Sequence, residues 1–194
     1  MSTLSKKYSF HEVFDSQKLF RLILEAMSNP TRTVDIREYA DKMFGDEPAL
    51  LAVAMTLLDN EIHFNTCENA ALADEITSLT LAKGSEPEDA DFIFVCKPDQ
   101  LQNVMECAKC GTLSDPHKSA TVVIRDDSSA SGNLTLYGPG IDGECQFPAS
   151  DLVQRALQLR DAQYYEYPQG IDFIFIAGSG ELFAIPRLVR WEVR

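Results

Sequence analysis

The chain has 194 residues, of which 45% are hydrophobic and 24% charged, a composition typical of a globular protein with one sizeable core. Its 30 acidic and 17 basic residues give a net charge of −13, which argues against binding to nucleic acid or to an anionic membrane, because both require a basic surface. No apolar run is long enough to cross a bilayer, and the first residues lack the apolar core of a signal peptide, so we expect a cytoplasmic protein.

The first half of the sequence predicts helices that alternate with short strands. Asp15 is a good N-cap for a helix over 16–28, whose buried face we expect to consist of apolar residues at helical spacing. These residues are Leu19, Phe20, Ile23, Leu24 and Met27. The next predicted elements are a strand over 33–36, an apolar, buried helix from Pro48 to Leu58, a strand over 61–66, and a helix over 70–82 that Asn69 caps and Gly84 ends.

The second half is richer in strands. Its predicted elements are strands over 92–96, 121–125, 134–137 and 144–148, a helix over 98–107, a helix over 150–162, and strands over 171–177, 182–185 and 189–193. The segments 85–91, 111–118 and 126–132 are predicted to be loops or turns. This order predicts an α/β fold in which one mixed β-sheet carries helices on both faces, within a single domain over residues 1–194.

The stretch Leu134–Gly143 contains an alternating strand pattern that runs into Gly138-Pro139-Gly140. The glycines match the spacing of a dinucleotide-binding GxGxxG motif, but that motif needs a helix that begins within the glycines. The residues that follow, 144–148, instead form a strand pattern. We therefore predict a strand–loop–strand corner whose glycines adopt backbone angles closed to other residues.

The five cysteines, at positions 67, 96, 107, 110 and 145, are expected to be free thiols. Cys107-Ala-Lys-Cys110 has the CxxC spacing, but no second pair of ligands lies at the close spacing that a zinc site would need, so we expect no metal site. The pair follows a predicted helix, where the helix dipole opposes a thiolate. Two interpretations remain, namely incidental cysteines or a free-standing thiol, redox or small-molecule enzyme that uses Cys107 and Cys110.

Two further features have alternative interpretations. His117-Lys118 resembles the pair that precedes the Schiff-base lysine of some pyridoxal-phosphate enzymes, although an exposed loop lysine is the simpler interpretation. Arg187, Arg190 and Arg194 form a basic patch near the C-terminus of an acidic chain. Arginines bind carboxylate or phosphate groups well, but these three can equally pair with acidic residues of the chain itself.

Several stretches, taken together, have the order and spacing of one family. They are 20–30 (FRLILEAMSNP), 57–61 (LLDNE), 111–112 (GT), 136–141 (LYGPGI), 167–174 (YPQGIDFI) and 182–187 (LFAIPR). The chain resembles the H subunit of the bacterial carbon–phosphorus lyase core complex, which degrades phosphonates. It departs from the family pattern at Thr31, Ile62, Tyr167 and Leu188-Val189, and the CxxC pair is not a family feature.

The resemblance implies a fold similar to the large domain of pyridoxal-phosphate-dependent transferases, without the cofactor. It also implies partners similar to the G, I and J subunits, with which the H subunit supports the formation of ribose 1-alkylphosphonate 5-triphosphate from ATP and an alkylphosphonate. No catalytic residue is assigned to the H subunit, so the resemblance implies none for this chain. The sequence agrees, because it contains no convincing acid/base, nucleophilic or metal-binding constellation.

Two expectations concern surfaces. The aromatic loop with Tyr164, Tyr165 and Tyr167 is expected to mediate self-association into a homodimer. The loop 138–143 and Pro186-Arg187 are expected to lie together at one edge of the sheet. There, Gly138, Pro139, Gly140, Asp172 and Arg187 would form a binding site for a ligand or a partner, with Arg187 as the positive charge. In the alternative interpretation, Arg187 only pairs with Asp142 or Asp172.

Overall fold

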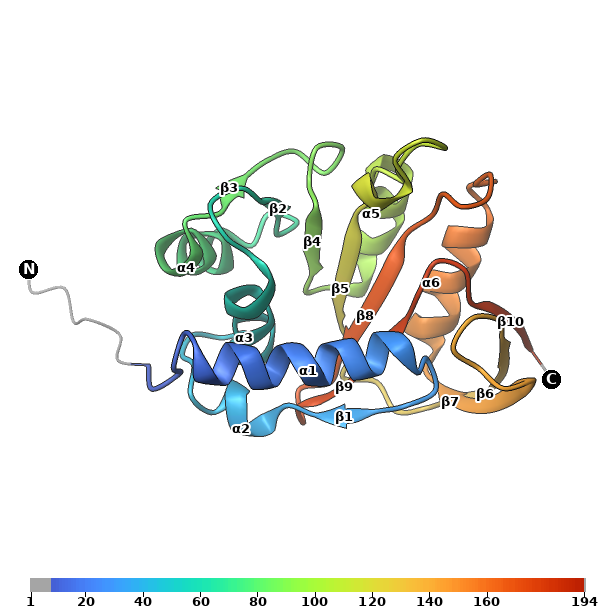
Figure 1. Cartoon of the computed structure of the whole chain (residues 1–194), viewed down its shortest axis with the longest axis horizontal. Helices are drawn as coiled ribbons and strands as arrows, with labels where there is room; N and C mark the ends of the chain where they lie inside the picture. The colour runs from blue at the N-terminus through green and yellow to red at the C-terminus, as the bar shows by residue number, and fades with distance from the viewer. Residues whose placement is uncertain (1–7, 194) are drawn as a thin grey trace, which may run out of the picture.

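A seven-stranded mixed sheet lies at the centre of the molecule in the computed structural model, which describes residues 8–193 (Figure 1). Its strands are β1 (Val34–Asp35), β2 (His63–Asn65), β3 (Lys83–Gly84), β4 (Phe92–Val95), β5 (Thr121–Arg125), β8 (Asp172–Ile176) and β9 (Glu181–Ile185). Their order is β1-β9-β8-β5-β4-β2-β3. The run from β8 to β3 is parallel, whereas β9 is antiparallel to both of its neighbours.

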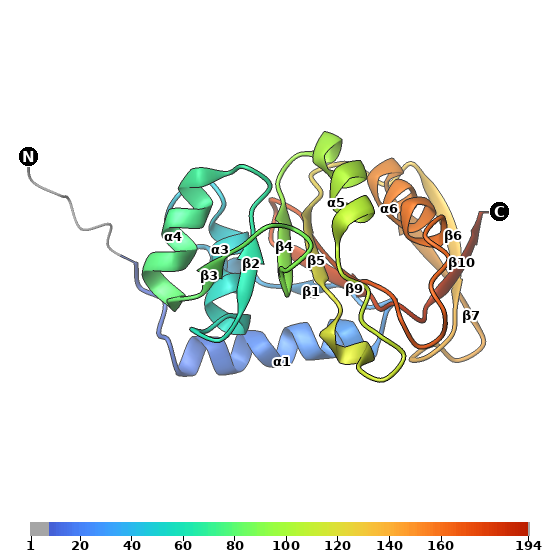
Figure 2. The same cartoon turned by 90° about the horizontal axis from the view of Figure 1, so that it is seen from above.

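Helices cover both faces of this sheet, as the sequence predicts. They are α1 (Phe14–Ser28), α2 (Arg37–Ala40), α3 (Pro48–Leu57), α4 (Ala70–Thr80), α5 (Leu101–Cys107) and α6 (Asp151–Asp161), with short 3₁₀ turns η1 (Pro98–Gln100) and η2 (Pro116–Lys118). The residues of α1 to α4 form one hydrophobic core, and those of α5 and α6 form a second core on the opposite face (Figure 2). No helix within residues 8–193 has the length and apolarity that a membrane span requires.

The strand β8, which lies inside the main sheet between β9 and β5, belongs to both cores. Ile174 and Ile176 pack into the core of α1 to α4, whereas Phe173 and Phe175 pack into the core of α5 and α6. Every residue of β8 is buried, since both of its faces are covered. This explains why its last four residues, 173–176, form a continuous apolar run rather than an alternating pattern.

A second, three-stranded sheet extends the face that carries α5 and α6. It consists of β10 (Arg190–Val193), β6 (Gly132–Tyr137) and β7 (Glu144–Ala149), which are antiparallel to one another in that order. The pattern after the glycines is thus a strand, as predicted. The prediction of one sheet for all strands is wrong, because β6, β7 and β10 form a sheet of their own.

The first helix differs from its prediction in two respects. Its N-cap residue is Val13 rather than Asp15, whose buried carboxylate accepts hydrogen bonds from the His11 backbone N–H at 2.8 Å and from Lys42 Nζ at 2.9 Å. The predicted buried face is also partly wrong, because Phe20 and Leu24 are about half exposed. The predicted Leu19 and Ile23 are buried in the core, Met27 packs against it partly buried, and Ala26, which was not predicted, completes the buried face.

The cap of α4 is confirmed, whereas its predicted end is wrong and two short elements were not predicted. Asn69 caps α4 as predicted, since its side-chain oxygen accepts a hydrogen bond from the Leu72 N–H. Gly84 does not end the helix, however, because Leu81 already adopts the left-handed conformation with φ of 62° and Gly84 lies in β3. The elements α2 and β3 were not predicted from the sequence, because they are too short to show a periodic pattern.

Gly140 provides a test of the packing between the β6–β7 loop and α1. Its φ is +83°, and an added Cβ would lie 2.6 Å from the carbonyl oxygen of Ser28. We expect Gly140→Ala to lower the free energy of unfolding in urea by roughly 1–3 kcal/mol, because both the backbone angle and the contact disfavour a side chain. Gly132→Ala is the matched control, since a Cβ there meets no atom within 4 Å. Equal effects of the two substitutions would contradict this account.

Candidate binding site

Segments far apart in the sequence meet where β9 leaves the main sheet. A Cβ on Gly138 would lie 3.0 Å from the carbonyl oxygen of Leu188, so the β6–β7 loop touches the turn that follows β9. Gly140 approaches Ser28 at the end of α1 in the same way. The expected proximity of the loop 138–143 to Pro186-Arg187 is therefore present.

Gly170 and the loop 110–118 complete this junction. A Cβ on Gly170, whose φ is +148°, would lie 2.9 Å from Cβ of Arg187. The N–H of Gly170 donates to the carbonyl of Cys110 at 3.0 Å, and the side chain of Gln169 donates to the carbonyl of Gly111 at 2.8 Å. Most of the stretches that carry the family resemblance thus pack against one another at one end of the main sheet.

Arg187 is bound by the chain's own groups at this junction. Its backbone N–H donates to Oδ1 of Asp172 at 2.7 Å, and its guanidinium binds both carboxylate oxygens of Asp172 and the carbonyl of Pro116. The two side chains are only 18% and 11% exposed. Of the two acidic partners considered for Arg187, Asp172 is the one it contacts.

Arg160, near the end of α6, is a buried side chain of this junction that was not predicted from the sequence. It is buried beneath the turn after β9 and donates from Nη2 to the carbonyl of Val189 at 2.7 Å and from Nη1 to that of Pro186 at 3.3 Å. Burial lowers the pKa of the Arg160 guanidinium, and the neighbouring Asp161 carboxylate opposes that shift. Its position could have been noticed, because it follows Val153 and Ala156 on the apolar side of the helix.

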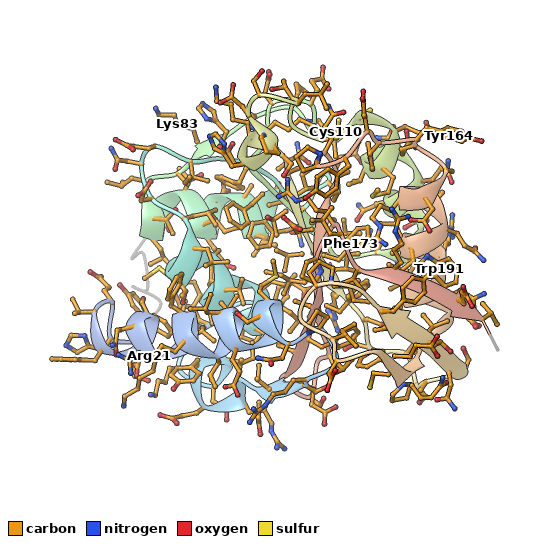
Figure 3. The ribbon with its side chains drawn as sticks, turned by 45° about the vertical axis from the view of Figure 1, so that its right-hand side comes forward. Arg21, Lys83, Cys110, Tyr164, Phe173 and Trp191 are labelled. Carbon is orange, nitrogen blue, oxygen red and sulfur yellow. The ribbon has the colours of Figure 1, made fainter. Side chains whose placement is uncertain are left out.

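A cavity of about 300 Å³ opens beside these arginines. Four tyrosines, one tryptophan and three arginines contribute most of its wall: Tyr137, Tyr164, Tyr165, Tyr167, Trp191, Arg160, Arg187 and Arg190. Burial raises the pKa of the Tyr165 hydroxyl, so this phenol stays neutral. Tyr164 and Tyr167 at the rim are 94% and 75% exposed, and Figure 3 shows Tyr164 and Trp191 on the same side of the molecule.

Arg190 is the cation of this cavity that is available to a ligand. Its side chain is exposed, and it makes no ion pair with any residue in the range 8–193. Trp191 beside it is held by a hydrogen bond from Nε1 to Asp161 Oδ2 at 2.7 Å. Arg194, the third member of the predicted basic patch, lies outside the described residues. A cavity with aromatic walls and a free guanidinium can bind an anionic group and shield it from water.

Neither cysteine of the predicted pair lines this cavity, although Cys110 lies against Gln169, which does. Cys107 is exposed at the end of α5, Cys110 is half-buried beside Gln169, and all five cysteines are unpaired thiols. Burial raises the pKa of the Cys67 thiol to about 12. Lys118 is exposed and pairs with Asp115 at 3.4 Å, as expected for a loop lysine. Within residues 8–193 no three His, Cys, Asp or Glu side chains are grouped to hold a metal ion.

Comparisons with known proteins agree with this set of motifs. The model of the family described as "Bacterial phosphonate metabolism protein (PhnH)" matches residues 9–192. The protein named "Putative C-P lyase subunit protein HtxG" from Stutzerimonas stutzeri is 30% identical over 172 residues, which cover 88% of this chain and 83% of that protein. The chain therefore belongs to the PhnH family of bacterial phosphonate metabolism proteins, as a subunit of the carbon–phosphorus lyase type.

Proposed function

We propose that the chain is a non-catalytic subunit of the carbon–phosphorus lyase core complex. In this proposal it assembles with subunits of the G, I and J types and supports the formation of ribose 1-alkylphosphonate 5-triphosphate from ATP and an alkylphosphonate. The observation that carries the proposal is the family match over residues 9–192. The name of the related HtxG protein, which calls it a carbon–phosphorus lyase subunit, supports the same role.

The state of the charged side chains supports a binding role rather than a catalytic one. Arg187 and Asp172 form an ion pair with each other, and the guanidinium of Arg160 donates hydrogen bonds to backbone carbonyls. Charged side chains whose hydrogen bonds are all made within the chain fix the conformation of the surface. A catalytic acid or base, in contrast, must be free to exchange a proton with a substrate. We also propose that the fold is similar to the large domain of pyridoxal-phosphate-dependent transferases, without their cofactor.

The junction and its cavity are proposed as the binding site for an anionic group of a ligand or partner. Gly138, Pro139 and Gly140 shape the loop beside the turn after β9, and the pair of Asp172 and Arg187 fixes that turn. Within this arrangement the structure offers Arg190, rather than Arg187, as the cation that can approach the anion. Phosphonate and phosphate groups are suitable anions, because a guanidinium binds two of their oxygens at once.

A homodimer in isolation is a further part of the proposal. The exposure of Tyr164 and Tyr167, at 94% and 75%, supports an interface at the aromatic loop. We expect light scattering at micromolar concentration to give the mass of a dimer for the isolated chain. Tyr164→Ser/Tyr167→Ser should shift the mass towards that of a monomer, and a monomeric mass for the wild type would contradict the proposal.

One experiment tests the subunit role and the site together. The chain is co-expressed with the G-, I- and J-type subunits, of which the I-type subunit carries an affinity tag, and the wild type is expected to co-purify. Arg190→Ala should keep the melting temperature, because the side chain is exposed, and should weaken binding of methylphosphonate or of the partners about tenfold. Binding is expected to weaken because the substitution of Arg190 removes the cation of the cavity that is available to a ligand.

Arg187→Ala serves as the contrasting variant. It leaves the carboxylate of Asp172 without its cation in a nearly buried position, so we expect the free energy of unfolding to fall by about 3 kcal/mol. Absence of the wild-type chain from the purified complex would contradict the subunit role. Unchanged binding of both the partners and methylphosphonate in Arg190→Ala would contradict only the proposed site.

A further inference from the structure

One edge of the small sheet lacks the features that keep sheet edges from pairing with a further strand. Within residues 8–193 the two sheets have four edge strands, which are β1, β3, β7 and β10. The strands β1 and β3 have only two residues each, and β7 contains Pro148, which has no N–H to donate. In contrast, β10 has four residues and contains neither glycine nor proline. It is therefore the edge best suited to accept another strand.

The outer edge of β10 is also open. The strand lies at the periphery of the molecule, close to the C-terminus, and β6 is the strand it pairs with among residues 8–193 (Figure 1). Arg190, Glu192 and Val193 are exposed, and the cavity of about 300 Å³ lies beside Arg190 and Trp191. Backbone N–H and C=O groups along such an edge can pair with a strand of another chain.

The charges on β10 are complementary to those of a second copy. Arg190 lies opposite Tyr137 of β6, and Glu192 follows on the same face of the small sheet, since side chains alternate along a strand. Glu192 accepts a hydrogen bond from the Tyr137 hydroxyl at 3.4 Å. Neither Arg190 nor Glu192 has an ion-pair partner in the range 8–193, so both charges are available to another molecule.

Two β10 strands that are antiparallel and related by a twofold axis have few possible registers. Side chains that lie opposite each other must point to the same face, so the axis passes through one residue that faces its own copy. With Trp191 on the axis, Arg190 of each copy lies opposite Glu192 of the other, which gives two ion pairs. With the axis moved by one residue to Arg190 or Glu192, that residue would face its own like charge. Among these registers, the charges favour the one centred on Trp191.

We propose that β10 pairs with β10 of a second copy, with Trp191 on the twofold axis, so that the small sheets of the two copies form one continuous antiparallel sheet. Tyr164 and Tyr167 lie across the cavity from the same edge and cover the new strand pair. This inference rests on the proposed function, because it specifies the interface of the homodimer proposed above. The ion pair uses the guanidinium that the proposed site offers to an anion, so the second copy and the anion compete for Arg190.

The test measures the dissociation constant of the dimer of the isolated chain by analytical ultracentrifugation. Trp191 is the single tryptophan of the chain, so a red shift of its emission on dilution reports the same equilibrium. Arg190→Glu and Glu192→Arg are each expected to weaken the dimer at least tenfold, because each places like charges opposite each other at two positions. Arg155→Glu is the matched control, because Arg155 is an exposed arginine of α6 outside the cavity wall, and it should dimerise like the wild type.

A mixture of the two single variants tests the register. When Arg190→Glu pairs with Glu192→Arg, opposite charges meet again at both positions across the axis. The mixture is therefore expected to form a heterodimer of about wild-type affinity, although each variant alone dimerises weakly. The double variant Arg190→Glu/Glu192→Arg should recover dimerisation for the same reason. Unchanged circular dichroism of all variants would show that the exposed substitutions leave the fold intact.

Each outcome separates this inference from the proposals on which it rests. Wild-type dissociation constants for both single variants would overturn the strand pair and leave the homodimer and the subunit role intact. Weakened single variants that do not recover in the mixture would overturn the register centred on Trp191. A monomeric wild type would overturn this interface together with the homodimer, whereas the subunit role depends only on assembly with the G-, I- and J-type subunits.

Discussion

Two arginines fix the turn that joins the main sheet to the small sheet, and the geometry of the site depends on them. Arg160 donates from below to the carbonyls of Pro186 and Val189, while Arg187 binds Asp172 at the start of β8. Hydrogen bonds that involve a charged group contribute about 1.5–3 kcal/mol each. Without them, buried carbonyls and a nearly buried carboxylate would lack partners, which is more costly than the loss of a surface ion pair.

This turn determines what its neighbours can do. It directs β10 away from β9 and towards β6, so that the small sheet forms beside α6. It also presents a carbonyl oxygen so close to Gly138 that a side chain there would contact it. The cavity exists between these parts because the arginines hold the turn, and its aromatic wall comes from the loop after α6 together with Tyr137 of β6 and Trp191 of β10.

The sequence predicts the regular elements well, because most of them depend on local signals. The continuous apolar run of β8, the cap at Asn69 and the strand after the glycines are all properties of neighbouring residues. The buried side of α1 is less predictable, since its apolar residues span a wide arc of the helix and periodicity cannot tell which part of that arc meets the core. The exposure of Phe20 is decided by tertiary packing.

The site could be predicted only in part for a similar reason. The approach of Gly138 to the turn after β9 follows from the glycines and the strand order, but the choice of Asp172 over Asp142 as the partner of Arg187 depends on tertiary packing. Strand pairing is a long-range property, so the departure of β10 into a second sheet left no local signal. Arg160 does give a local signal in the sequence, because it is a cation on the apolar side of a helix. Its carbonyl partners, however, lie in a turn that is distant in the sequence.

In the proposed complex this chain binds, and the assembled subunits carry out the chemistry. The release of adenine from ATP in the presence of methylphosphonate measures that chemistry directly. We predict no adenine release from the isolated chain, release from the complex with the G-, I- and J-type subunits, and a large loss when this chain is omitted. Adenine release by the isolated chain, or an undiminished rate in its absence, would contradict the central claim that it is a non-catalytic subunit of the complex.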